Sequence, residues 1–134
     1  MSKRLKKLQR FIRHSKGEIE VRNHFSKKFP NHEWKHTGWL TVGGQRILRD
    51  LYSDKLKVCV EYDGIWHFEN INGQLKYKRS VDKKLQKWCL KNKYRLIRIS
   101  ESFYKDDIDF SLKLLEHKVY SSNRRLVKLG EEYK

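Results

Sequence analysis

The alternation of apolar and polar residues predicts two neighbouring β-strands near the middle of the chain. Residues 47–52 are rich in β-branched and large apolar side chains, and residues 58–62 resume this pattern after the turn-forming pair Ser53 and Asp54. Two such segments joined by a short turn are typical of an antiparallel hairpin. Because side chains alternate across a strand, the apolar side of the second segment faces the core and its acidic side faces away from it.

Helical periodicity is present on both sides of this hairpin. Residues 15–29 begin with the capping-box pattern of Ser15 and Glu18 and end before a proline. Residues 77–91 repeat apolar side chains on one face, and Asn92 is a suitable C-cap. These two segments predict amphipathic helices that pack against the sheet.

The remaining segments complete an α/β pattern. Residues 94–100 form a compact apolar strand directly after a helix, which predicts a β-helix-β crossover and a parallel neighbour for the hairpin. Residues 31–44 indicate a first strand and a loop, and a last amphipathic helix begins near Asp107. The expected fold is one α/β domain, a mixed sheet flanked by helices. Its expected parts are a basic N-terminal helix (1–14), the main domain (15–120) and a basic, partly ordered tail (121–134).

The chain is strongly basic. Its 134 residues include 32 Lys and Arg against 16 Asp and Glu, a formal net charge of +16. Such a positive field favours a polyanionic partner, and nucleic acid is the first candidate. An acidic membrane surface is the rival, but the sequence contains neither an apolar run of membrane-spanning length nor the apolar core of a signal peptide. We therefore expect a soluble, cytoplasmic protein, with Cys59 and Cys89 as buried free thiols.

Basic residues concentrate in the expected N-terminal helix. Leu5, Leu8 and Ile12 recur there at helical spacing, and lysines and arginines surround them. This surface is either a solvated face that aids solubility or a strip that lies along phosphates, and the net charge favours the second interpretation. The candidate phosphate-binding residues are Lys3, Arg4, Lys6, Lys7, Arg10 and Arg13.

Histidines and tryptophans between residues 31 and 44 suggest packing more than chemistry. His32 and His36 lack a cysteine partner or a second histidine pair at zinc spacing, which favours surface or packing roles. Trp34 and Trp39 are interpreted as core or edge aromatics, and wedges that unstack DNA bases are the alternative.

The candidate chemistry lies on the central hairpin, in Asp50, Glu61, Asp63 and His67. A turn centred near Lys55 brings Asp50 towards Glu61, and Gly64 lets the chain turn and present His67 to the same acids. Carboxylates held close together repel each other unless a proton or a cation lies between them. Hard oxygen ligands at this spacing suit Mg²⁺, with Mn²⁺ as an alternative.

Four pieces of the sequence occur in a characteristic order: Asp50, EYDGIWH from Glu61 to His67, DKK from Asp82, and YRLIRIS from Tyr94. This combination resembles the very-short-patch-repair-like branch of the PD-(D/E)xK nucleases, over residues 15–100. The branch includes phage homing endonucleases with an acid-acid-His-acid signature, in which an N-terminal helix supplies the first Glu. The resemblance implies a restriction-endonuclease-like mixed sheet. Asp63 stands in place of the superfamily's E-x-K lysine, for which His67 is the natural substitute.

Three residues outside the hairpin have two interpretations each. Glu18 either only closes the capping box or, as the resemblance implies, reaches over the sheet to the metal site. Asp82 either pairs with Lys78 or Arg79 on an exposed helix face or, as a family-matched position, orients His67 or a second water. Arg98 either holds a phosphate at the active face or forms an edge salt bridge.

The sequence therefore predicts a Mg²⁺-dependent endonuclease that acts on double-stranded DNA. Asp50 and Glu61, with a main-chain carbonyl near Tyr62, would hold the metal, and Asp63 is a further ligand or fixes the site. His67, with an unperturbed pKa of about 6.5, exchanges protons with the attacking water or the leaving oxygen. A nucleic-acid-binding module without cleavage is the alternative. The residues leave open repair nicking against homing, and whether the protein forms a homodimer.

Overall fold

The computed structural model describes residues 15–134, so the predicted basic helix of residues 1–14 and its six predicted phosphate-binding residues lie outside the described part of the chain. Five strands form one sheet: β1 (Lys35–Val42), β2 (Gln45–Ser53), β3 (Val58–Asp63), β4 (Arg95–Ser100) and β5 (Leu126–Leu129). The α-helices are α2 (Lys16–Lys28), α3 (Leu75–Lys91), α4 (Glu101–Asp106) and α5 (Ile108–Tyr120). Short 3₁₀ turns are η1 (Pro30–His32), η2 (Ile65–His67) and η3 (Glu131–Tyr133).

The sheet is mixed, and its strand order is β1-β2-β3-β4-β5. The first three strands are antiparallel neighbours, whereas β4 runs parallel to β3 and β5 runs parallel to β4. Helix α3 connects β3 to β4, which is the crossover that the sequence predicted. The predicted α/β class, a mixed sheet flanked by helices in one domain, is confirmed.

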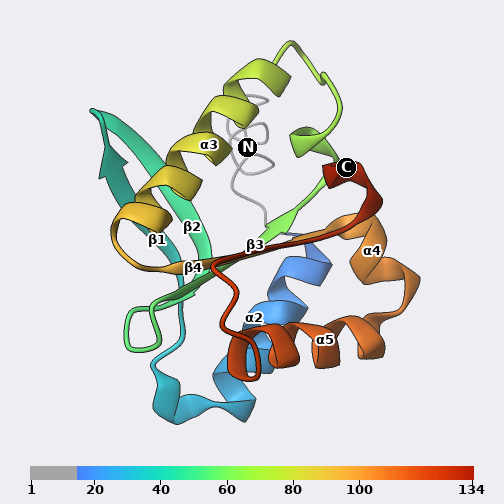
Figure 1. Cartoon of the computed structure of the whole chain (residues 1–134). Coiled ribbons are helices and arrows are strands. Elements are labelled where there is room, and N and C mark those ends of the chain that lie inside the picture. The colour runs from blue at the N-terminus through green and yellow to red at the C-terminus, as the bar shows by residue number, and fades with distance from the viewer. Residues whose placement is uncertain (1–14) are drawn as a thin grey trace, which may run out of the picture.

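Helices cover both faces of the sheet (Figure 1). Helices α2, α4 and α5 pack on one face and share the larger core, which includes Phe25, Val60, Ile97, Tyr104 and Leu115. Helix α3 covers the other face, where the smaller core contains Cys59, Leu85, Cys89 and Leu96. All six residues of β3 are therefore buried, although the sequence pattern assigned only its apolar side to the core. Both cysteines are buried free thiols, as expected.

Helix α2 begins where the sequence places its cap. The Ser15 side chain accepts a hydrogen bond from the Glu18 N–H at 3.2 Å, which satisfies one of the free donors of the first turn. Gly17 lies against β3, and a Cβ atom at this position would be only 2.3 Å from the Tyr62 hydroxyl oxygen. The glycine thus allows the first turn of α2 to contact the end of β3.

The C-terminal segment differs from the expected tail. Its four-residue strand β5 pairs with β4, with Val127 opposite Ile97, and extends the sheet. The Arg95 guanidinium holds the start of this segment by donating to the carbonyls of Lys118, Val119 and Ser122. These contacts join distant parts of the chain, so the short apolar run among basic residues gives little sign of them in the sequence.

Candidate active site

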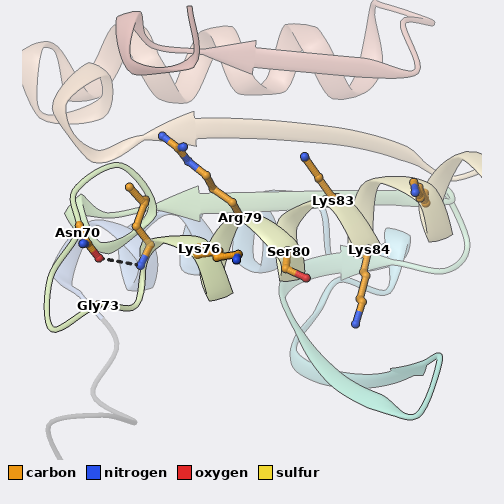
Figure 2. A pocket seen from close by; sticks show the side chains of 9 residues that line it. Asn70, Gly73, Lys76, Arg79, Ser80, Lys83 and Lys84 are labelled. Carbon is orange, nitrogen blue, oxygen red and sulfur yellow. Dashed lines mark hydrogen bonds between the residues drawn. The ribbon is translucent and has the colours of Figure 1, made fainter.

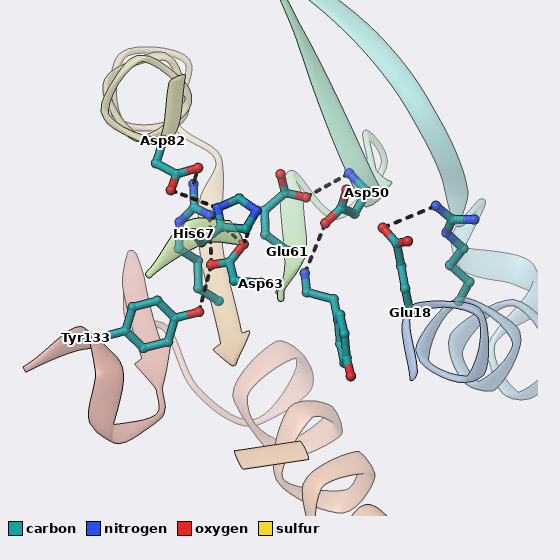
Figure 3. Close-up of polar contacts among 10 residues, drawn as sticks. Glu18, Asp50, Glu61, Asp63, His67, Asp82 and Tyr133 are labelled. Atoms are coloured by element: carbon teal, nitrogen blue, oxygen red, sulfur yellow. Dashed lines mark hydrogen bonds and ion pairs between the residues drawn. The ribbon is translucent and has the colours of Figure 1, made fainter. Parts of the chain in front are cut away.

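The sheet opens between β2 and β3 at Asp50. Strand β2 pairs with β1 over Gln45–Tyr52 but with β3 only over Leu51–Ser53. Beyond that point acidic side chains bind the backbone: the Asp50 N–H donates to Oε2 of Glu61 at 2.7 Å, and the Tyr62 N–H donates to Oδ2 of Asp50 at 3.1 Å. These bonds fix the two carboxylates side by side (Figure 3).

The electrostatics of this acid pair are unfavourable. Burial raises the pKa of Asp50 well above its ordinary value, and the charges of Glu18 and Asp63 raise it further. Burial also raises the pKa of Glu61, and the charge of Asp50 adds to the shift while Arg98 partly opposes it. The site therefore favours a proton or a cation between these carboxyl groups.

Glu18 projects from the first turn of α2 towards Asp50 (Figure 3). Its backbone N–H is capped by Ser15, and its carboxylate lies 3.4 Å from the Arg22 guanidinium. The capping role and the position at the site therefore coexist. Glu20 is directed elsewhere, because it accepts a hydrogen bond from the Tyr104 hydroxyl at 2.8 Å.

His67 lies beyond the end of β3, between two acids. Its Nδ1 is 3.0 Å from Oδ2 of Asp82 on α3, and its Nε2 is 3.5 Å from Oδ1 of Asp63. Gly64 has ordinary extended backbone geometry (φ −77°), so the turn back to the acids is made by η2 rather than by a glycine-specific conformation. The structure thus brings His67, Asp63 and Asp82 together.

The surroundings of His67 favour its protonated form. Burial alone would lower its pKa, but the hydrogen bond to Asp82 and the negative charges of Asp63 and Asp82 outweigh burial and raise it. Burial raises the pKa of Asp82, but its bond to His67 and the charge of Arg98 reverse that shift and leave it lowered. The hydrogen bond between His67 and Asp82 therefore favours the imidazolium and the carboxylate together.

Arg98 joins the two acids that contact His67. Its Nη1 donates to both carboxylate oxygens of Asp63, at 3.1 and 3.0 Å, and its Nη2 is 3.4 Å from Oδ1 of Asp82. The residue is only 3% exposed. Of the two interpretations from the sequence, the structure contains a salt bridge, on a central strand rather than at an edge, and the phosphate contact stays a prediction.

Tyr133 also belongs to the site, although no motif in the sequence indicates this role. Its hydroxyl donates to Oδ2 of Asp63 at 2.7 Å, and its ring packs edge-on against Phe68. Burial and the charge of Asp63 raise the pKa of this hydroxyl, so it stays a donor. Asp63 therefore accepts hydrogen bonds from Arg98 and Tyr133 and also lies next to His67.

The histidines and tryptophans of residues 31–44 lie away from these acids. His32 is 2.8 Å from the Tyr120 hydroxyl, and Trp34 donates to the same hydroxyl at 3.0 Å and packs against the larger core. His36 contacts the adjacent threonine. Trp39 is 55% exposed on β1, with the Arg46 guanidinium over its ring.

Within residues 15–134, no group of three or more His, Cys, Asp or Glu side chains is arranged to hold a metal ion. The described helices likewise include none that is long and apolar enough to cross a membrane. No protein-family model, curated protein or solved structure matches this chain. The nuclease resemblance and the roles assigned to the site residues therefore stay predictions.

Proposed function

We propose that this protein is a metal-dependent endonuclease that hydrolyses phosphodiester bonds in DNA. The observation that carries the proposal is the pair of the half-buried Asp50 and the buried Glu61, fixed side by side where β2 leaves β3. Two ionised carboxylates held this closely destabilise the folded protein unless something neutralises them.

The donor set suits a hard divalent cation. Asp50 and Glu61, together with the main-chain carbonyl of Tyr62, would hold Mg²⁺ or Mn²⁺, because ionised carboxylates and carbonyls are the ligands these ions prefer. The raised pKa values of the two acids fit this assignment, since a cation would stabilise their ionised forms. When bound, the metal would polarise the scissile phosphate and lower the pKa of a water molecule.

His67 would act as the proton donor. Its Nδ1 faces Asp82, which fixes the ring, so Nε2 is the atom that exchanges a proton with substrate. The raised pKa shifts the ring towards the imidazolium, the form that can protonate the leaving oxygen. Asp63, held by Arg98 and Tyr133, would stabilise that charge from the Nε2 side.

A single observation favours the alternative, a module that binds nucleic acid without cleaving it. Residues 15–134 offer no cluster of three metal-binding side chains, so any metal would depend on two carboxylates and a carbonyl. The net charge of +16 supports a nucleic-acid partner under either function.

Plasmid cleavage tests the proposal directly. Asp50→Asn and Glu61→Gln should each lower Mg²⁺-dependent nicking by roughly 10³-fold or more, because several kcal/mol of charge stabilisation is lost. A gel shift on the same preparations should show nearly unchanged DNA binding. Glu20→Gln is the matched control, since Glu20 contacts Tyr104 and should leave cleavage unchanged. Full activity in both site variants would disprove the proposed site, and a wild-type protein that binds but never cleaves would establish the alternative.

A further inference from the structure

The outer face of α3 carries a row of lysine and arginine side chains around a shallow hollow of about 630 Å³ (Figure 2). The hollow is lined by charged and polar side chains that include Asn70, Lys76, Arg79, Lys83, Lys84 and Lys87. It lies on the side of α3 opposite the buried Leu85 and Cys89. Helix α3 thus has one face for the core and one for solvent, and the charged residues on the solvent face are all basic.

This charge is not balanced locally. Over Leu75–Lys91 the chain has seven basic residues and one acidic residue, Asp82, which is directed to His67 and Arg98. Lys76, Arg79, Lys83 and Lys87 are exposed and form no ion pair with any residue in the described part of the chain. Lys84 differs, because it donates to the side chain of Gln45.

Stability of the helix does not account for this row. Arg79 and Lys83 are four residues apart, as are Lys83 and Lys87, and like charges at this spacing destabilise a helix by about 0.2–0.5 kcal/mol per pair. Some exposed lysines outside α3 do have acidic partners: Lys105 is 2.7 Å from Glu101, and Lys28 is 2.7 Å from Glu116. The row on α3 combines the lack of such partners with like charges at a repulsive spacing, so an external anion would stabilise it.

We propose that this face of α3 binds the phosphate backbone of double-stranded DNA. From Lys76 to Lys87 the helix rises roughly 16 Å, at 1.5 Å per residue, so the row is long enough to contact several successive phosphates of one strand. None of the described residues that line the hollow is aromatic. Because single-stranded nucleic acid is usually held by stacking bases on aromatic side chains, this lining fits a duplex backbone better.

The position of the row relates it to the acids, and this part of the inference rests on the proposed function. Helix α3 presents the basic row outward and Asp82 inward to His67. The loop residues Asn70 and Gly73, at one end of the hollow, follow His67 in the chain. A duplex on this face would therefore lie beside the segment that carries the proton donor.

The spacing of the row was visible in the sequence. Lys76, Arg79, Lys83 and Lys87 fall at i, i+3, i+7 and i+11, which is one helix face.

The test compares two triple variants of the full chain that remove the same charge from opposite layers. Lys76→Gln/Lys83→Gln/Lys87→Gln changes the α3 face, and Lys27→Gln/Lys113→Gln/Lys118→Gln changes α2 and α5. Binding to a fluorescent 20-base-pair duplex is measured without divalent metal between 50 and 200 mM salt. The α3 triple should bind roughly 10-fold or more weakly, and its slope of log K against log salt should fall by about 2.7, since each phosphate contact contributes about 0.9. The control triple should keep the wild-type slope.

Three outcomes would overturn the inference. They are an unchanged slope in the α3 triple, an equal loss in both triples, and tighter wild-type binding to a single strand than to the duplex. Thermal melts of each variant show whether a loss of binding reflects unfolding, and single Lys83→Gln and Lys87→Gln variants then replace a triple that fails to fold. The binding measurement does not depend on cleavage, so the two proposals can fail separately. An Asp50→Asn variant that still cleaves DNA would disprove the proposed function but not the binding face. An α3 triple variant with wild-type DNA binding would disprove the binding face but not the proposed function.

Discussion

Two acids on the same side of β3, Glu61 and Asp63, have opposite surroundings although both are almost completely buried, at 5% and 1% exposure. Glu61 faces another acid, Asp50, and repulsion adds to the burial that raises its pKa. Asp63 faces Arg98 and the Tyr133 hydroxyl, which both donate to it. The site therefore has two halves. In the uncompensated half, Glu61 and Asp50 repel each other; in the compensated half, Arg98 and Tyr133 offset the charge of Asp63.

The difference suits two separate roles in the proposed function, one for Asp63 and one for the pair of Asp50 and Glu61. Asp63 is held by its partners, and together with Asp82 it lies against the imidazole of His67 and favours the charged form of that ring. An uncompensated acid pair is poised to accept a cation, because binding would remove the repulsion. In the proposed function, proton transfer uses the compensated environment and metal binding uses the uncompensated one. The two environments are only two residues apart along β3.

The largest expected effect is on catalysis, in the compensated half. His67→Ala should lower the single-turnover cleavage rate at saturating Mg²⁺ by roughly 10²–10⁴-fold, as for loss of a general acid or base. Because the pKa of His67 is raised, the ratio of wild-type to variant rate should be largest at low pH and should fall as the pH rises through that pKa.

His36→Ala is the control for that measurement, since the exposed His36 side chain is hydrogen-bonded to the neighbouring Thr37 rather than to the acids of the site. A stable His67→Ala variant with the wild-type rate would rule out the catalytic role. A ratio that instead grows with pH would identify His67 as a base rather than a donor.

The next largest expected effect is a loss of stability when the positive charge that compensates Asp63 is removed. Arg98→Met leaves Asp63 buried without its cation, and removal of one partner from a buried ion pair destabilises a protein by about 3–5 kcal/mol. Chemical denaturation should therefore show a large loss of unfolding free energy. Adding Asp63→Asn should recover part of it, because the unpaired charge is then absent.

Arg49→Met is the matched comparison for Arg98→Met. Arg49 is also buried, at 7% exposure, but its carboxylate partner Asp54 is half-exposed at the turn. Water can solvate Asp54 when the arginine is removed, so the loss of that charge pair should cost less. Equal losses in the two variants would show that lost packing, rather than the unpaired charge of Asp63, dominates.

The sequence predicted the acid pair because it depends on local geometry. One hairpin joins Asp50 and Glu61, and a tight turn sets the register that places them opposite each other. The sequence also predicted the cap at Ser15, which depends on a short motif, and the parallel pairing of β4 with β3, which depends on a single crossover. These features required no knowledge of how distant segments pack.

The compensated half could not be predicted in the same way. Tyr133 reaches Asp63 across 70 residues, and it does so only because β5 pairs beside β4 and η3 then brings the chain end back over the site. Nor did the sequence indicate that α4 follows β4 directly, with Ser100 as its N-cap. Contacts of this kind depend on strand order at the far side of the sheet, which no local pattern encodes.

The smallest expected effect is a gain in stability, in contrast to the loss expected for Arg98→Met. It should follow when one acid of the uncompensated half is neutralised. Asp50 and Glu61 have folded-state pKa values raised above those of the unfolded chain. Their contribution to stability is therefore fully present below about pH 4, near the unfolded values, and is lost as the pH rises through the raised values. Asp50→Asn removes one of these ionisations, so the metal-free variant should melt higher than wild type at neutral pH.

A gain of about 1 kcal/mol corresponds to roughly 3–6 °C in a domain of this size. The difference in Tm between Asp50→Asn and wild type should grow with pH above about 4 and shrink again when Mg²⁺ is added, because the cation stabilises only the wild-type pair. Thermal melts across pH, with and without Mg²⁺, measure both trends, and Glu20→Gln should show neither. A variant that melts lower than wild type at every pH, with no response of wild type to Mg²⁺, would mean that the pair is a hydrogen-bonded structural element and that repulsion is not stored there.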